Sequence, residues 1–196
     1  MSTRSLTTGR DGVIDAVDAV VLAVGSKGMR ALMAGSPACA AAAPELVTAG
    51  ALDAIDVVSV RLWLDRYVPV ADPANVFSRF SALRGSGATF FMLDQLQQGD
   101  QAALWGDQPV QGSVIASDFY NATAIAELSD QAIVDCLMQE LLPMAVPAFK
   151  AARVVDQEVR RYPASVSLFS PGSFHQRPPL ETSLAPVVCA GDWVRM

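Results

Sequence analysis

The sequence predicts a mixed fold in which an α/β unit with a parallel sheet is interrupted by a mainly antiparallel unit of sheet plus helix. Two short and nearly continuous apolar runs, residues 18–25 and 187–190, have the pattern of parallel strands that are buried on both faces. Segments between them alternate apolar and polar side chains, which is typical of antiparallel strands with one face in water. We therefore expect residues 1–50 and 187–196 to form one unit and residues 51–186 to form the other.

The length and composition predict a substantial core. The chain has 196 residues, 52% of them hydrophobic, and a chain of this size buries roughly 70% of its unfolded surface. No stretch approaches the ~20 consecutive apolar residues of a transmembrane helix, so we do not expect an integral membrane protein. The apolar surplus favours an apolar small-molecule ligand, a peripheral membrane contact, or faces that a larger complex covers.

Charge and cysteine content exclude several classes of function. The net charge is −6 and lysines and arginines are not clustered, which argues against a nucleic-acid partner. Cys39, Cys136 and Cys189 are widely spaced in apolar surroundings, as expected for reduced core thiols rather than a disulfide framework or a zinc site. We expect no metal site. The first residues lack the apolar core of a signal peptide, so an intracellular or organellar location is expected and secretion is not indicated.

The first unit is expected to begin with a turn and to continue as strand and helix. The Asp-Gly pair within residues 8–12 predicts a hairpin turn. The apolar run 18–25 predicts a strand, and a short helix is expected over 27–33. Residues 34–55 are rich in alanine, and Pro37 and Pro44 predict a broken helical or irregular connector.

The second unit is predicted to contain several strands that have one face exposed to solvent. Apolar side chains alternate with polar ones from Val58 to Asp65, with Trp63 as the exception. Residues 88–95 and 113–119 have the same character, and they are separated by loops rich in glycine and glutamine.

A capped helix, a polar strand and a long loop are expected next. Ser129 is suited to cap a helix whose apolar residues recur every fourth position, and Pro143 and Pro147 are expected to bend or end that helix. Residues 153–162 predict a polar strand. Residues 163–186 contain five prolines and predict a loop that runs over a surface or along a site.

The strongest candidate site follows the last strand, at Gly191, Asp192 and Trp193. Glycine lets a ligand approach the backbone closely, and a carboxylate accepts hydrogen bonds from hydroxyl groups. The structural alternative is that Asp192 caps a turn and that Trp193 belongs to the core.

Four segments, taken in order and with their spacing, resemble the C-terminal part of the FAD-dependent amine oxidase and carotenoid (phytoene) desaturase superfamily: 18–25, 160–165, 170–173 and 187–193. The resemblance implies a partial FAD-binding, Rossmann-like domain in residues 1–50 and 187–196 and a substrate-type domain in residues 51–186. It implies that Gly191 and Asp192 lie against the flavin nucleotide and that Trp193 packs near its ring. The activity implied is that of an FAD-dependent oxidoreductase acting on an apolar or amine substrate. The flavin does the chemistry, so no catalytic residue is assigned.

The sequence also departs from that superfamily. Its Gly-x-Gly-x-x-Gly fingerprint is missing, because Gly85-Ser86-Gly87 is followed by Phe90 at the third glycine position. The helix expected after the Gly-Asp pair is missing too. The FAD site is therefore expected to be incomplete in this chain, with a missing FAD-domain half or a larger complex as partner. The alternatives are a non-catalytic scaffold or complex subunit derived from such an enzyme, and an unrelated α/β binding domain.

Other candidate chemistry has less support. His175 is the only histidine, and it lies in the proline-rich loop, where an exposed residue is more common than a catalytic one. Residues 25–28 have no complete phosphate-loop order and predict a strand-to-helix turn. Phe90, Phe91, Trp63 and Phe119 are candidates for an apolar pocket, although aromatic residues on strands more often belong to the core.

Overall fold

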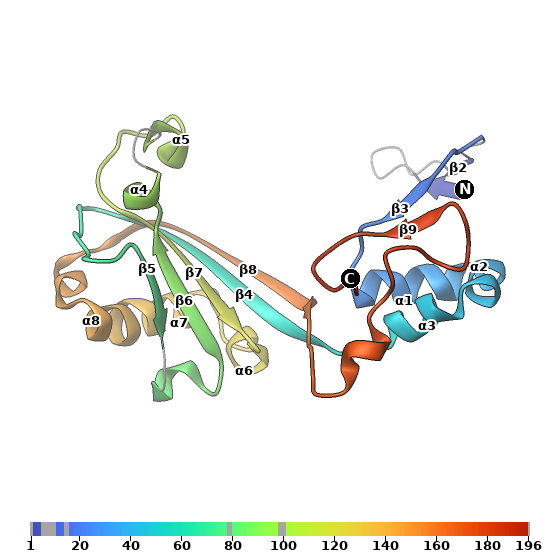
Figure 1. The fold of residues 1–196 in the computed structure, drawn as a ribbon. Coiled ribbons are helices and arrows are strands. Elements are labelled where there is room, and N and C mark those ends of the chain that lie inside the picture. Colours follow the sequence, from blue (N-terminus) through green and yellow to red (C-terminus); the bar gives the residue numbers. More distant parts are fainter. Residues whose placement is uncertain (1, 5–10, 14–15, 78–79, 98–100, 196) are drawn as a thin grey trace. The chain divides into compact units, whose positions relative to one another are not determined.

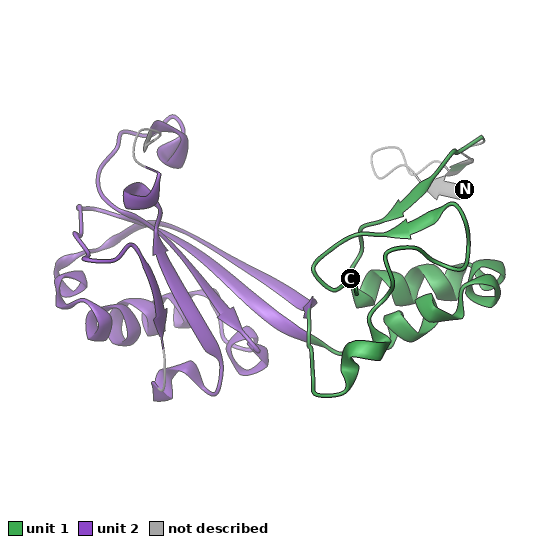
Figure 2. Cartoon of the chain, viewed as in Figure 1, with its two compact units in different colours: residues 1–54, 167–196 green, residues 55–166 purple. Residues whose placement is uncertain are grey.

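The computed structural model describes residues 2–4, 11–13, 16–77, 80–97 and 101–195. The chain divides into two compact units, residues 1–54 with 167–196 and residues 55–166 (Figure 2). The pattern of the sequence predicts these boundaries at 50/51 and 186/187. The chain thus returns to the first unit at Ser167, well before the final strand.

The first unit contains a parallel pair formed by the two apolar runs. Strands β3 (Val20–Leu22) and β9 (Val187–Cys189) pair in parallel, with Val20 opposite Val187. A further backbone hydrogen bond joins Ala190 N to Leu22 O at 3.1 Å. The prediction that the first and last apolar runs are neighbours in one parallel sheet is confirmed (Figure 1).

The expectation that these strands are buried on both faces is wrong. Val21, at the centre of β3, is 61% exposed, whereas Cys189 is fully buried and Leu22 packs with it in the core of this unit. The sheet has only two strands among the described residues, and helices cover one of its faces. The apolar side chains of the other face consequently remain in contact with solvent.

Three helices supply the rest of this core. The predicted helix is α1 (Ser26–Gly35), and the connector forms α2 (Pro37–Ala42) and α3 (Pro44–Gly50). Both prolines lie at the start of a helix, where the missing N–H costs no intrahelical bond. They therefore begin helices as well as separating them. The buried residues of this cluster are Met29, Met33, Ala43, Leu46, Ala49, Leu52, Cys189, Trp193 and Val194.

A two-stranded hairpin lies at the N-terminus. Strand β1 (Ser2–Arg4) pairs antiparallel with β2 (Asp11–Val13), and Arg4 lies opposite Asp11. The Asp-Gly pair is therefore part of a strand rather than the turn, because the connection between the strands is longer than two residues. Residues 8–10 of the predicted turn lie outside the described residues.

The second unit is built on a five-stranded sheet in the order β5-β6-β7-β4-β8. The strands are β4 (Ala54–Leu64), β5 (Ala74–Phe77), β6 (Gly87–Met92), β7 (Val114–Tyr120) and β8 (Val154–Ser167). Adjacent pairs from β5 to β4 are antiparallel, as the alternating pattern predicts. Residues 93–95 were expected in a strand, but they belong to helix α4 (Leu93–Leu96).

Helices pack on one face of this sheet, around a core that runs from Val58 to Phe149 and lies wholly within the unit. Ser129 caps α7 (Asp130–Asp135) as predicted, since its Oγ accepts a hydrogen bond from Ala132 N at 3.2 Å. A wide π-helical turn, η2 (Cys136–Leu141), leads into α8 (Leu142–Ala145). Within this turn Leu142 N–H reaches Leu137 O, five residues back.

Pro143 therefore does not end the helix. The wider spacing before it accommodates a residue that lacks an N–H. The remaining short elements are η1 (Ser81–Leu83), α5 (Gln101–Trp105), α6 (Thr123–Ala126), η3 (Pro147–Ala151) and η4 (Ser173–Gln176).

In the described part of the chain, no helix combines the length and the apolar character required to cross a bilayer.

Candidate functional site

The parallel pairing of β3 and β9 defines the edge where a nucleotide site is expected. Both strands run toward this edge, so the start of α1 at Ser26 and the turn at Gly191–Asp192 follow the carboxyl ends of neighbouring strands. Ligands of open α/β sheets bind in the crevice outside the carboxyl ends of their strands. The turn predicted from sequence thus lies at the edge that this rule specifies.

Gly191 occupies a backbone conformation that favours glycine. Its φ is +130°, a value that side-chain-bearing residues rarely adopt. A Cβ at this position would lie 3.1 Å from Trp193 Cδ1. The exposed backbone of Gly191 therefore stays bare, which allows close approach from solvent or by a ligand.

Trp193 is 2% exposed and packs into the core of the first unit. Its Nε1 is buried and has no hydrogen-bond partner among the described residues. The ring lies directly beside Gly191, because a Cβ on that glycine would come within 3.4 Å of Nε1. This burial agrees with the core alternative for Trp193. A contact with a flavin ring stays a prediction.

Asp192 is exposed, and within the described residues its carboxylate makes no hydrogen bond. It does not cap the turn through its side chain. Two carboxylate oxygens at the edge of the sheet are therefore available to accept hydrogen bonds from hydroxyl groups of a ligand.

Arg177 fixes this turn, although no pattern in the sequence predicts that role. Its Nε donates to Trp193 O at 2.9 Å, and its Nη2 donates to Asp192 O at 3.0 Å and to Val194 O at 2.8 Å. The guanidinium also lies 4.7 Å from the ring centre of Phe169, within the range of a cation–π contact. A lone arginine in a proline-rich loop carries no sequence signal that links it to a distant turn.

The remaining sequence candidates have mostly structural positions. His175 is exposed in η4, with its ring against Phe174. The three cysteines are free thiols, and burial raises the pKa of Cys136 and of Cys189, which disfavours the reactive thiolate. Among the described residues, no group of three or more His, Cys, Asp or Glu side chains could hold a metal ion.

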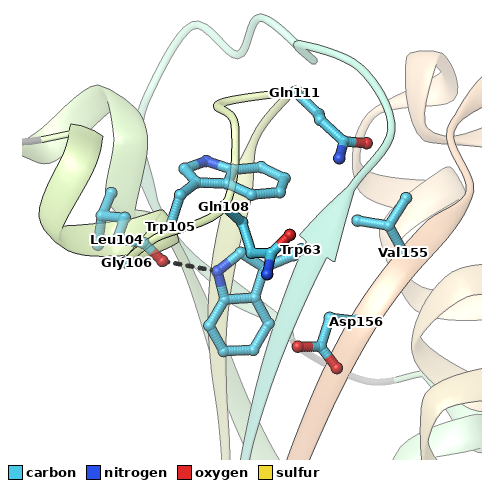
Figure 3. Close-up of a pocket in the computed structure, with 8 residues that line it drawn as sticks. All are labelled: Trp63, Leu104, Trp105, Gly106, Gln108, Gln111, Val155 and Asp156. Carbon is cyan, nitrogen blue, oxygen red and sulfur yellow. Dashed lines mark hydrogen bonds between the residues drawn. The ribbon is translucent and has the colours of Figure 1, made fainter.

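The aromatic candidates separate into two groups. Phe90 and Phe119 are fully buried in the core of the second unit, as the core alternative predicts. Trp63 instead lines a hollow of about 370 Å³ together with Trp105 (Figure 3).

The chain is similar in sequence to a curated protein and similar in fold to solved structures. No family model matches the chain. The chain is 30% identical over 178 residues to the carotenoid phi-ring synthase of Streptomyces griseus, a match that covers 91% of this chain and 32% of that protein. This chain thus spans about a third of the length of that curated relative.

The fold also matches a crystal structure from Exiguobacterium sp. 255-15, of a protein provisionally named protoporphyrinogen oxidase. The TM-score is 0.58 at 13% identity, over 98% of this chain and 41% of that one. An identity this low is evidence for the fold alone. The comparisons therefore show a sequence similarity to a third of one protein and a fold similarity to part of another, and neither singles out the C-terminal part of such proteins.

Proposed function

We propose that this chain is part of an FAD-dependent oxidoreductase of the carotenoid desaturase and protoporphyrinogen oxidase type, in which residues 55–166 form the substrate-side unit. The observation that carries the proposal is the parallel β3–β9 pair, which ends in the Gly191–Asp192 turn. The similarity to a carotenoid phi-ring synthase over 91% of the chain supports the same class.

The residues at the turn fit a flavin nucleotide. Gly191 offers bare backbone, the Asp192 carboxylate is exposed for hydrogen bonds to ribityl or ribose hydroxyls, and the buried Trp193 N–H lacks an acceptor among the described residues. Bound FAD would supply hydride or electron acceptance. The chain's own contribution would be to hold the nucleotide through Asp192, while Arg177 keeps the turn in place.

The rest of the nucleotide-binding domain would come from elsewhere, as a missing half or a partner chain. The exposed apolar face of β3, centred on Val21, is where we place that partner, because parallel sheets are normally covered on both faces. A non-catalytic scaffold is the less favoured alternative, since both similar proteins are named as enzymes.

The substrate class that we propose is an extended apolar molecule, with an amine as the alternative. The related sequence is named for a carotenoid ring, and the high apolar content of this chain suits a hydrophobic ligand or a peripheral membrane contact.

The test is flavin binding by the full-length gene product that contains this chain. We expect purified protein to show flavin absorption bands, and we expect Asp192→Ala to weaken FAD binding about tenfold, as for loss of a hydrogen bond to a charged group. Asp18→Ala is the matched control, because Asp18 is an exposed carboxylate that precedes β3 at the opposite edge of the same sheet.

Two results would contradict the proposal. One is a full-length protein that neither carries flavin nor takes up added FAD. The other is equal FAD affinity in the Asp192 variant, the Asp18 variant and the unmodified protein, which would remove Asp192 from the site.

A further inference from the structure

The second unit contains a polar hollow that the flavin assignment does not use. It has a volume of about 370 Å³ and is lined by Trp63, Leu104, Trp105, Gly106, Gln108, Gln111, Val155 and Asp156. This volume falls at the lower end of the ~300–1,000 Å³ that is usual for small-molecule sites. All of these residues lie within residues 55–166, so the hollow belongs to one unit.

The walls of the hollow are fixed by hydrogen bonds. Trp63 Nε1 donates to Leu104 O at 2.7 Å, which joins the indole of β4 to helix α5 (Figure 3). Asp94, in α4, is 4% exposed, and its carboxylate accepts from Ser113 Oγ at 3.0 Å and from Val114 N at 3.1 Å.

The loop that carries the glutamines is also held at its far end. A Cβ on Gly112 would lie 2.4 Å from Arg66 N, so the loop backbone packs directly against the backbone of the residues that follow β4. Walls held in this way lose little conformational entropy when a ligand binds.

The lining combines ring faces with groups that pair with hydroxyls. Trp63 and Trp105 lie on the α5 side, and Val155 and Asp156 of β8 lie across from them (Figure 3). Gln108 and Gln111 are exposed and contribute amide donors and acceptors. The described residues that line the hollow include no lysine or arginine, which disfavours an anion.

Trp105 is the more buried of the two indoles. It is 7% exposed, and its Nε1 is buried with no partner among the described residues. Because Nε1 is shielded from solvent, Trp105 contributes its ring rather than its N–H to the lining of the hollow.

We propose that this hollow binds a neutral polyhydroxylated ring, that is, a sugar or a glycosyl end-group. The apolar C–H face of such a ring packs on the indoles, and its hydroxyls pair with the Asp156 carboxylate and with the amides of Gln108 and Gln111. This site is independent of the proposed FAD contacts, because it shares no residue with them.

The indole N–H signals in a ¹H–¹⁵N NMR spectrum of the whole chain test this proposal. The three tryptophans give one indole signal each, and Trp193 belongs to the other unit. On titration with methyl β-glucoside we expect saturable shifts of the Trp63 and Trp105 signals and none of the Trp193 signal.

Comparison with octyl β-glucoside, below its micelle concentration, distinguishes two sources of the same chemistry. Tighter binding of the octyl compound would indicate a glycosyl group on an apolar molecule, and equal binding would indicate a free saccharide. Asp156→Asn should weaken binding about tenfold. Gln139→Ala, at an exposed glutamine outside the hollow, should leave binding unchanged.

Because the same spectra report folding, a misfolded variant is recognised directly. The absence of saturable shifts with both glucosides would overturn the proposal, as would shifts produced by toluene or choline but not by the glucosides.

Discussion

At the scale of single residues, Gly191 is the position where a side chain is least compatible with the turn. We expect Gly191→Ala to lower the free energy of unfolding by about 1–3 kcal/mol, because the new Cβ meets the Trp193 ring in an unfavourable backbone region. Urea denaturation monitored by tryptophan fluorescence measures this change.

Gly35→Ala is the matched control in the same unit. Gly35 ends α1, and a Cβ there would meet nothing within 4 Å. Its substitution should leave stability unchanged or slightly raised. An equal loss for the two variants would show that Gly191 is not specially constrained.

A second residue-scale prediction concerns Asp65, which directly follows β4. The hydrogen bond from the neighbouring Arg66 guanidinium, and then that from Arg153 N, lower the pKa of the Asp65 carboxyl. A lowered folded-state pKa means that the contribution to stability is present above the unfolded pKa of about 3.9. That contribution is lost as the pH falls through the folded-state value.

We therefore expect Asp65→Asn to reduce stability at neutral pH and to flatten the decline on acidification. Urea midpoints measured at pH 7 and at about pH 3 test this. A variant that loses stability on acidification as steeply as the unmodified protein would refute the assignment.

At the scale of elements, the N-cap of α7 is a local feature that the sequence predicts and the structure contains. Removing the Ser129 hydroxyl by Ser129→Ala leaves Ala132 N without its acceptor and should cost about 1 kcal/mol in a thermal or urea unfolding experiment. Ser165→Ala, at an exposed serine in β8, is the control and should change stability by no more than ~0.5 kcal/mol. Indistinguishable variants would mean that the cap adds nothing.

Elements differ in how far the sequence predicts them. The alternation in β4 and β7 identifies both strands, since their buried positions recur with period two. Strand β5 was not predicted, because four residues after Pro73 carry too little pattern. Residues 93–95 turn into α4 rather than extending β6, and that turn brings the Asp94 carboxylate to Ser113, a tertiary contact invisible in a local pattern.

The residues of the candidate site could likewise be predicted only where a local sequence pattern marks them. Gly191 and Asp192 were identified because a Gly-Asp pair after an apolar strand is a local signal. The role of Arg177 depends on loop folding, and the exposure of Val21 depends on how many strands the sheet contains. Neither follows from the residues near them in sequence.

At the scale of the whole molecule, the second unit has its own core, so residues 55–166 should fold alone. We expect this fragment to unfold in one cooperative urea transition, with a free energy of about 5 kcal/mol or more. Phe90→Ala, which removes a fully buried ring that contacts Phe77 and Phe149, should lower that value by about 3–5 kcal/mol. A fragment without a cooperative transition would show that the unit depends on the remainder of the chain.

The chain leaves the first unit and returns to it at neighbouring positions. Leu168 N donates to Asp53 O at 2.8 Å, so the peptide that departs and the peptide that returns are tied together at the base of β4 and β8. An inserted domain whose two ends lie close together can be replaced by recombination, because the replacement does not distort the surrounding domain. Diversification of such proteins is then expected to proceed by exchange of this insert, while the unit that contains the parallel β3–β9 pair stays constant.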